Sequence, residues 1–263
     1  MNRVAGISFR TSKIIGRKIF HYLRVTSTQD KAKKFAEKGF PEGTIVIAET
    51  QTLGKGRLGR RWVSPRGGIW VSVILRPEIA AMEAPKMTMI GSLAVAKAIA
   101  ELTGMEVKVK WPNDVLIPAI AGGPFKKVCG VLTEMVLGAG RVSYIIAGLG
   151  INVNNRIPPA LRPKAISLKD AMGRTVAKQK LLRRALEKFD RYYLEFKKKG
   201  MAPIMKEYKG MSAVLDKEVE IECPEKIIRG KALDIDEYGA LIVQTGGGRK
   251  RVIAGDVTIL SKV

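Results

Sequence analysis

The sequence has little of the chemistry on which hydrolytic triads and zinc sites depend. Among its 263 residues are one histidine, His21, and two cysteines. A single histidine near the N-terminus does not supply a Ser/His/Asp or Cys/His arrangement. Cys129 and Cys223 lie far apart and lack the CxxC or Cys/His spacing of a metal site. We therefore expect ordinary reduced thiols, and catalysis by other side chains.

Long apolar runs are also missing. No stretch approaches the roughly 20 residues that a membrane-spanning helix needs. The N-terminal segment carries Arg3 and Arg10 but has no continuous apolar run of the kind found in signal peptides. The sequence therefore predicts a cytoplasmic protein without a membrane segment.

Acidic residues are few beside the basic ones. The chain has 24 Asp and Glu against 47 Lys and Arg, which gives a net charge of +23. Such a field attracts anions, and nucleic acid, an acidic protein surface or a phosphorylated small molecule would each suit it. With an aromatic content of 6% the chain offers few stacking platforms for single-stranded nucleic acid. Nucleic-acid binding therefore stays as a lesser alternative.

The hydrophobic pattern indicates an α+β protein with a mixed or antiparallel sheet. Apolar residues at helical spacing predict helices over 29–39, 84–102 and 178–199. Residues 126–153 read as a hairpin that turns at 138–140. From about residue 209 the sequence consists of short segments in which apolar and polar residues alternate, which suggests the strands of a small β-barrel. We expect a catalytic domain over 1–209 and a C-terminal domain over 210–263.

The segment TLGKGRLGRRW contains Gly54, Gly56 and Gly59 at G-x-G-x-x-G spacing. A dinucleotide fingerprint needs a helix after the glycines, and Ser64-Pro65 with the following glycines forbids one. The kinase and phosphate-loop patterns fail as well, because their partner residues are absent. Turned backbone amides and interleaved cations still favour an anion. We expect a loop that is mobile when empty and closes over a phosphate or carboxylate.

Two further segments carry unusual residues. KWPNDV ends a strand with an aromatic ring, a rigid turn and two polar side chains. KKVCGVLTEM places Lys127 in an apolar strand, where a lysine either reaches the edge or serves a buried anion. Strict alternation puts Lys127 on one face with Cys129 and Val131. GLGINVN interrupts a strand with glycines that permit close approach of a ligand or another backbone.

Taken in order, TSTQD, ETQTLGKGRLGRRW, KWPNDV, KKVCGVLTE and GLGINVN resemble the catalytic domain of biotin protein ligases, and the C-terminal strands resemble their SH3-like domain. The resemblance implies a class II synthetase-like fold and a two-step reaction. Biotin and Mg-ATP first give biotinyl-5′-AMP and pyrophosphate. A lysine of a biotin carboxyl carrier protein, an acidic acceptor, then displaces AMP.

The resemblance also implies roles for individual residues. Lys127, Arg57 and Lys55 would be catalytic. The biotin site would contain Ser27, Thr28, Gln29, Gln51, Lys55, Gly56, Arg57, Lys127, Gly130, Gly148 and Gly150. The nucleotide would meet Arg57, Arg60, Trp62, Asn113 and Asn152, with Mg²⁺ held by ligands that the sequence does not identify. Asp114 suits a turn as well as a site.

Several expectations concern specificity and assembly. Fewer than 25 residues precede the first motif, so we expect a monofunctional ligase with no N-terminal DNA-binding domain and no DNA partner. The family makes a homodimer a candidate assembly. A ligase of the same fold acting on lipoate or octanoate stays as the alternative, although the polar Gln51, Ser27 and Thr28 favour biotin. Position 29 is Gln where many relatives have Asn, and Lys55 stands where Arg is common.

Overall fold

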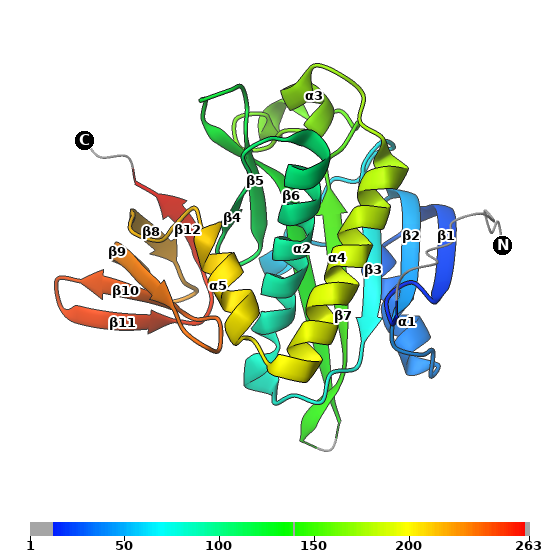
Figure 1. Ribbon diagram of the computed structural model, residues 1–263, viewed down its shortest axis with the longest axis horizontal. Helices are drawn as coiled ribbons and strands as arrows, with labels where there is room; N and C mark the ends of the chain where they lie inside the picture. The colour runs from blue at the N-terminus through cyan, green and yellow to red at the C-terminus, as the bar shows by residue number, and fades with distance from the viewer. Residues whose placement is uncertain (1–12, 139, 261–263) are drawn as a thin grey trace.

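The computed structural model describes residues 13–138 and 140–260, and its centre is a seven-stranded sheet (Figure 1). Only β1 and β2 run parallel, and all other neighbours in this sheet are antiparallel. In spatial order the strands are β1 (Lys18–Val25), β2 (Thr44–Gln51), β3 (Ile69–Leu75), β7 (Arg141–Ile151), β6 (Phe125–Gly138), β5 (Asp114–Pro118) and β4 (Lys108–Lys110).

Helices cover both faces of this sheet. On one face α2 (Pro85–Thr103) packs against β6 and β7, and α4 (Lys178–Lys199) lies beside α2 (Figure 1). On the other face α1 (Thr28–Glu37) packs Ala32 and Ala36 against Val46 of β2 and Ile146 of β7. Side chains along a strand point alternately to the two faces of the sheet, so each strand contributes to the apolar layer beneath α2 and to the one beneath α1.

The N-terminal segment is tied to α4. The Asp190 carboxylate accepts hydrogen bonds from the backbone N–H groups of Lys13, Ile14 and Ile15 at 2.7–2.9 Å. Asp190 is only 4% exposed, and the three donors satisfy its buried charge. These bonds fix the entry of the chain into β1.

The C-terminal unit is a five-stranded antiparallel sheet. Its strands are β8 (Glu218–Glu222), β9 (Ile227–Ile235), β10 (Leu241–Thr245), β11 (Gly248–Val252) and β12 (Asp256–Ile259), in the order β11-β10-β9-β8-β12. Before it come two helices, α3 (Leu168–Met172) and α5 (Ala202–Gly210). The Trp111 indole Nε1 donates to Gly239 O at 2.8 Å and so joins the two sheets.

The predicted fold class is confirmed, and the helices predicted over 84–102 and 178–199 form nearly residue for residue as α2 and α4. The β6–β7 hairpin also forms, although Ala139 of its predicted turn lies outside the described residues. The short helices α3 and α5 were not predicted. The domain division at 209 and 210 stays a prediction, and it falls in the last turn of α5.

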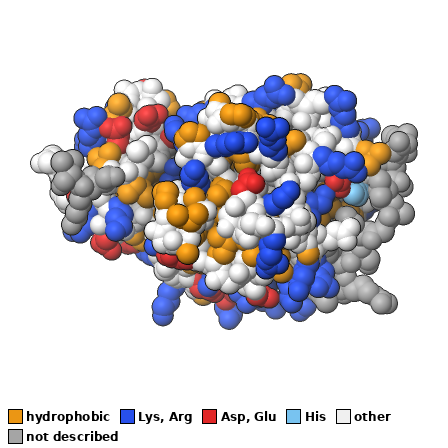
Figure 2. Space-filling model, turned by 90° about the horizontal axis from the view of Figure 1, so that it is seen from above, with side chains coloured by type: hydrophobic (Ala, Val, Ile, Leu, Met, Phe, Trp, Pro, Cys, Tyr) orange, Lys and Arg blue, Asp and Glu red, His pale blue; other side chains and the backbone are white. Residues whose placement is uncertain are grey.

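The surface reflects the excess of basic residues. Lys and Arg side chains are spread widely over the face shown in Figure 2, and hydrophobic side chains gather between them near its middle. In the part of the chain that the structure describes, no helix has the length and apolar character needed to span a bilayer.

Candidate active site

A cavity of about 1010 Å³ lies on the sheet face that carries α1, and it extends to the C-terminal unit. Its walls come from the start of α1, the glycine-rich connection between β2 and β3, the strands β6 and β7, and β12. Every residue that the resemblance assigned to biotin, nucleotide or catalysis lines it: Ser27, Thr28, Gln29, Gln51, Lys55, Gly56, Arg57, Arg60, Trp62, Asn113, Lys127, Gly130, Gly148, Gly150 and Asn152. The roles of these residues stay predictions.

One end of the cavity is polar and closed to solvent. Ser27 caps α1, with its hydroxyl accepting from the Asp30 N–H. Gln51 Oε1 accepts from the Thr28 N–H at 2.7 Å and lies 3.0 Å from Thr28 Oγ1. Ser72 of β3 adds a third hydroxyl, and no motif of the sequence includes it. The end therefore offers several fixed hydrogen-bonding groups to a small polar ring.

The floor of the cavity consists of two paired glycines beneath Trp62. Gly130 of β6 and Gly150 of β7 are partners in the sheet. A Cβ at Gly150 would lie 2.6 Å from Trp62 Nε1, and one at Gly130 would lie 2.9 Å from Trp62 Cζ3. Only glycine leaves room for the indole at these positions. The buried Trp62 Nε1 has no hydrogen-bond partner among the described residues.

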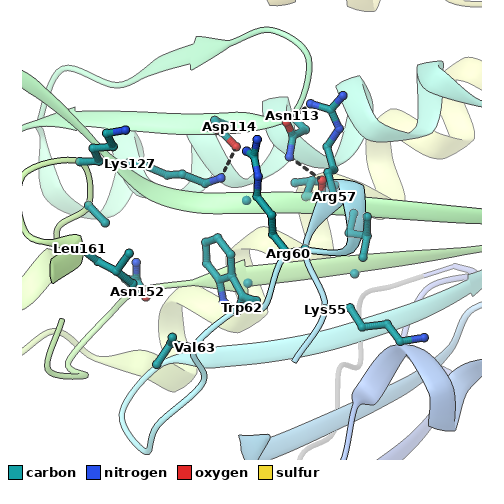
Figure 3. A pocket seen from close by; sticks show the side chains of 18 of the residues that line it. Lys55, Arg57, Arg60, Trp62, Val63, Asn113, Asp114, Lys127, Asn152 and Leu161 are labelled. Atoms are coloured by element: carbon teal, nitrogen blue, oxygen red, sulfur yellow. Dashed lines mark hydrogen bonds and ion pairs between the residues drawn. The ribbon is translucent and has the colours of Figure 1, made fainter. Parts of the chain in front are cut away.

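Lys127 lies above this floor, on a different face from the one that alternation predicts. Its Nζ lies 2.6 Å from Asp114 Oδ1 and 5.1 Å from the centre of the Trp62 ring (Figure 3). Strand β6 carries a bulge at Val128, because Cys129 pairs with Val115 while Lys127 pairs with the next residue of β5, Leu116.

The bulge corrects the predicted face. Cys129 and Val131 are buried in the core with α2, whereas a Cβ at Gly130 would lie 3.1 Å from Lys127 Cε. Lys127 therefore shares the face of Gly130, and the prediction that it shares the face of Cys129 and Val131 was wrong. Its identification as the lysine that faces the cavity holds, because Lys126 reaches the Arg162 carbonyl instead.

The other end of the cavity is cationic and involves both units of the chain. Arg57 Nη1 lies 3.1 Å from Asn113 Oδ1, 3.2 Å from Gly255 O and 3.3 Å from Asp256 Oδ1. Arg60 forms an ion pair with the same Asp256 carboxylate. Figure 3 shows both arginines directed toward the side of the pocket that holds Asn113 and Asp114. The C-terminal unit thus supplies a carboxylate to the glycine-rich loop.

Lys55 lies apart from this cationic end. It forms an ion pair with Asp30 of α1, and its side chain is 41% exposed. The hydrogen bond to Asp30 raises the pKa of Lys55 above its ordinary value. In Figure 3 the Lys55 side chain points away from Lys127 and toward α1. The predicted closure of the loop on a ligand stays a prediction.

Further residues of the cavity had no recognised signal in the sequence. Lys110 donates to Val257 O at 3.1 Å, and burial lowers its pKa despite the opposing charge of Asp114. Asp256 belongs to the C-terminal unit, whose contribution no catalytic-domain motif reveals. Asn152, in contrast, was predicted, and its Oδ1 accepts a hydrogen bond from Asn155 Nδ2 at 3.0 Å.

The residues that the structure describes contain no group of three or more His, Cys, Asp and Glu placed to hold a metal.

Comparison with known proteins agrees with this geometry. Residues 22–152 match the biotin/lipoate A/B protein ligase family, and residues 214–260 match the biotin protein ligase C-terminal domain. The bifunctional ligase/repressor BirA of Bacillus subtilis is 34% identical over 94% of this chain and 76% of its own length. The biotin–[acetyl-CoA-carboxylase] ligase of Paracoccus denitrificans is 30% identical over 89% of this chain and 97% of its own.

A solved structure extends the agreement to three dimensions. The biotin protein ligase of Aquifex aeolicus, in complex with biotin and ATP, superposes with a TM-score of 0.79 at 29% identity. The match covers 94% of this chain and all of that one. The five motifs, the cavity that gathers them and the matching C-terminal unit therefore show that this chain belongs to the biotin protein ligase family.

Proposed function

We propose that the cavity activates biotin with ATP and transfers it to an acceptor lysine. The observation that carries this proposal is that one continuous cavity joins a closed polar end to a cationic end, with Lys127 between them. A biotin head suits the polar end, and the phosphates of ATP suit the arginines. The biotin carboxylate would then meet the α-phosphate beside Lys127.

In the first step a biotin carboxylate oxygen attacks the α-phosphorus, and pyrophosphate leaves. Negative charge builds on oxygens that Lys127 and Arg57 can approach, and fixed cations at such a point are the main source of rate enhancement in this type of chemistry. The short Lys127–Asp114 contact holds the ammonium in position before the substrates arrive. Trp62 closes one side of the cavity.

In the second step the amine of an acceptor lysine attacks the acyl carbon, and AMP leaves. The nucleophile belongs to the acceptor, so the chain needs no serine, cysteine or histidine of its own for catalysis. The Paracoccus denitrificans relative is named for acetyl-CoA carboxylase. We therefore propose the biotin carboxyl carrier of that enzyme as the acceptor, with an acidic surface attracted by the +23 charge of this chain.

Mg²⁺ would accompany ATP. Magnesium is bound in many such sites by one or two protein oxygens, phosphate oxygens and water. The Asp114 carboxylate, together with the Asn113 and Asn152 amide oxygens, offers suitable donors along the cavity wall. The ion would neutralise phosphate charge, while the protein side chains hold the phosphates and the biotin carboxylate together.

The direct test is exchange of labelled pyrophosphate into ATP with purified protein and magnesium. We expect exchange that depends on biotin, because adenylation is reversible. Absence of exchange with every carboxylate offered would contradict the proposal. Lipoate and octanoate serve as the comparison, since the family that matches residues 22–152 includes lipoate ligases. Faster exchange with lipoate would select the alternative.

Three accompanying expectations remain proposals. We place the enzyme in the cytoplasm, where ATP and reduced thiols such as Cys129 and Cys223 are found. A homodimer is to be tested by light scattering. Binding of DNA with sequence preference and a steep salt dependence would support the alternative function, a basic nucleic-acid-binding protein.

A further inference from the structure

The polar end of the cavity contains a buried network in which the direction of each hydrogen bond can be assigned. Gln29 Nε2 lies 2.9 Å from Glu134 Oε2, 3.3 Å from Ile146 O and 3.4 Å from Leu132 O. All three are acceptors, so the NH₂ group must face them. The opposite orientation would place Gln29 Oε1 against three oxygens. Oε1 therefore faces Ser72 Oγ, at 2.9 Å, and accepts its hydrogen.

The direction of the Gln51 amide is fixed in the same way. Its Nε2 donates to Ser64 Oγ at 2.8 Å, and its Oε1 accepts the Thr28 N–H. The Thr28 hydroxyl lies 3.0 Å from this Oε1 and 2.9 Å from Ser72 Oγ. The hydrogen of Ser72 is already given to Gln29, so Thr28 donates to Gln51 or to Ser72. In either case the Thr28 hydrogen stays inside the network.

The two hydroxyls therefore present lone pairs, and not hydrogens, to the cavity. Ser72 and Thr28 are 0% and 4% exposed, so water does not readily compensate a missing partner. A ligand whose head carries N–H donors satisfies these oxygens. A head that offers only acceptors or apolar atoms leaves them unpaired, which is costly in a buried site. The ureido ring of biotin has two N–H groups, whereas the dithiolane of lipoate has none.

We infer that Ser72 determines specificity by accepting a hydrogen bond from a ureido N–H, and that Gln29 is a positioning residue that directs the Ser72 hydroxyl. The inference rests on the proposed function, since it concerns the same cavity. Gln29 uses its own amide on protein partners, so it acts through Ser72. Gly148 allows this, because a Cβ there would lie 2.7 Å from Gln29 Oε1.

The experiment measures biotin-dependent pyrophosphate exchange for the wild type, Ser72→Ala, Gln29→Met and the double variant. Each is assayed with biotin and with a biotin methylated on one ureido nitrogen. We expect Ser72→Ala to raise KM for biotin about tenfold, as for loss of a buried hydrogen-bond partner. The kcat and KM for ATP should stay within about twofold, because the phosphate end is untouched. The preference for biotin over the methylated analogue should shrink.

The double variant tests whether Gln29 positions the Ser72 hydroxyl or contacts the ligand directly. If Gln29 acts only through Ser72, the double variant should be no weaker than Ser72→Ala alone, whereas independent contacts would multiply. Additive losses, or a Ser72→Ala enzyme with unchanged KM and unchanged discrimination, would overturn the inference.

A matched control is Ser92→Ala in α2, which removes another buried hydroxyl that lies outside the cavity and bonds to Thr88 O. We expect its KM for biotin to match that of the wild type. Thermal unfolding of each variant reports any loss of folding. If Ser72→Ala is unstable, Ser72→Cys keeps the volume and weakens the acceptor, and it should lose the same discrimination. Absence of exchange in the wild type would be a failure of the proposed function, and not of this inference.

Discussion

Lys127 and Lys126 are adjacent lysines with different environments. Lys127 faces the cavity and pairs with Asp114, whereas Lys126 donates to the Arg162 carbonyl at the surface. We expect Lys127→Ala to reduce pyrophosphate exchange by about 100-fold or more, because a cation at the developing charge is lost. Lys126→Ala makes the same chemical change one residue away and should leave exchange unchanged. Normal exchange in Lys127→Ala would remove this lysine from the mechanism.

The buried Lys110 leads to a prediction about proton uptake when ATP binds. Burial lowers its pKa from the ordinary 10.5, with Asp114 opposing the shift. Bound phosphate would favour the charged amine and raise the pKa again. In the pH range between the lowered and the raised pKa, ATP binding should therefore take up protons. Titration calorimetry in buffers of different ionisation enthalpy measures this uptake. Lys110→Met should lose it, and undiminished uptake in that variant would assign it to another group.

At the scale of elements, the paired glycines of β6 and β7 act together as a flat support for Trp62. We expect Gly150→Ala to displace the indole, since the new Cβ would lie 2.6 Å from Trp62 Nε1. Exchange should fall by roughly tenfold or more, because small displacements in an active site are costly. Gly247→Ala is the control, as its Cβ would meet only Thr245 Oγ1 at 4.0 Å. Equal activity of both variants would contradict the supporting role.

How far the sequence predicts the elements depends on their length and regularity. Helices α2 and α4 are long and periodic, and their bounds were predicted closely. The five residues of α3 and the nine of α5 span too few turns to show a period. The bulge at Val128 leaves no mark in the residue pattern, because it is set by pairing with β5. Alternation alone therefore gave the wrong face for Lys127.

The residues of the site also differ in how far the sequence alone reveals them. Motifs with glycine, lysine and arginine in a fixed order identified many, but not all, of the residues that line the cavity. Ser72 looks like any polar residue within a buried strand, and only its contacts with Thr28 and Gln29 reveal its place. Asp256 lies about 200 positions from Arg57, and its contribution depends on how the two units pack.

At the scale of the whole molecule, Asp256 connects the C-terminal unit to the loop that carries Arg57 and Arg60. We expect Asp256→Asn to loosen this loop in the absence of substrates, because two ion pairs lose their carboxylate. Limited trypsin digestion should then cleave after Arg57 or Arg60 several-fold faster, since proteolysis follows local opening. Biotin with ATP should restore protection by providing another anion.

The control for this prediction is Asp216→Asn in the same unit. The Asp216 side chain is 81% exposed and lies 3.8 Å from Lys231 Nζ, and among the described residues it forms no ion pair with the loop. It has a positive φ of 63°, which asparagine tolerates. Its digestion should match that of the wild type. Faster cleavage in Asp216→Asn as well would indicate general loosening of the unit, and equal cleavage in all three proteins would show that the ion pairs do not hold the loop.

The bulge in β6 has a consequence for how this enzyme can vary. One extra residue determines whether Lys127 points toward the cavity or toward the helices, so the direction of this lysine depends on an odd or even count along a single strand. Deleting Val128 would remove the bulge together with the extra residue, so Lys127 and Cys129 would pair with Leu116 and Val115 in a regular ladder and Lys127 would keep its direction. An added residue between Lys127 and Gly130 would turn the lysine toward the apolar side unless β5 absorbs it, whereas substitutions that keep the count leave its direction intact.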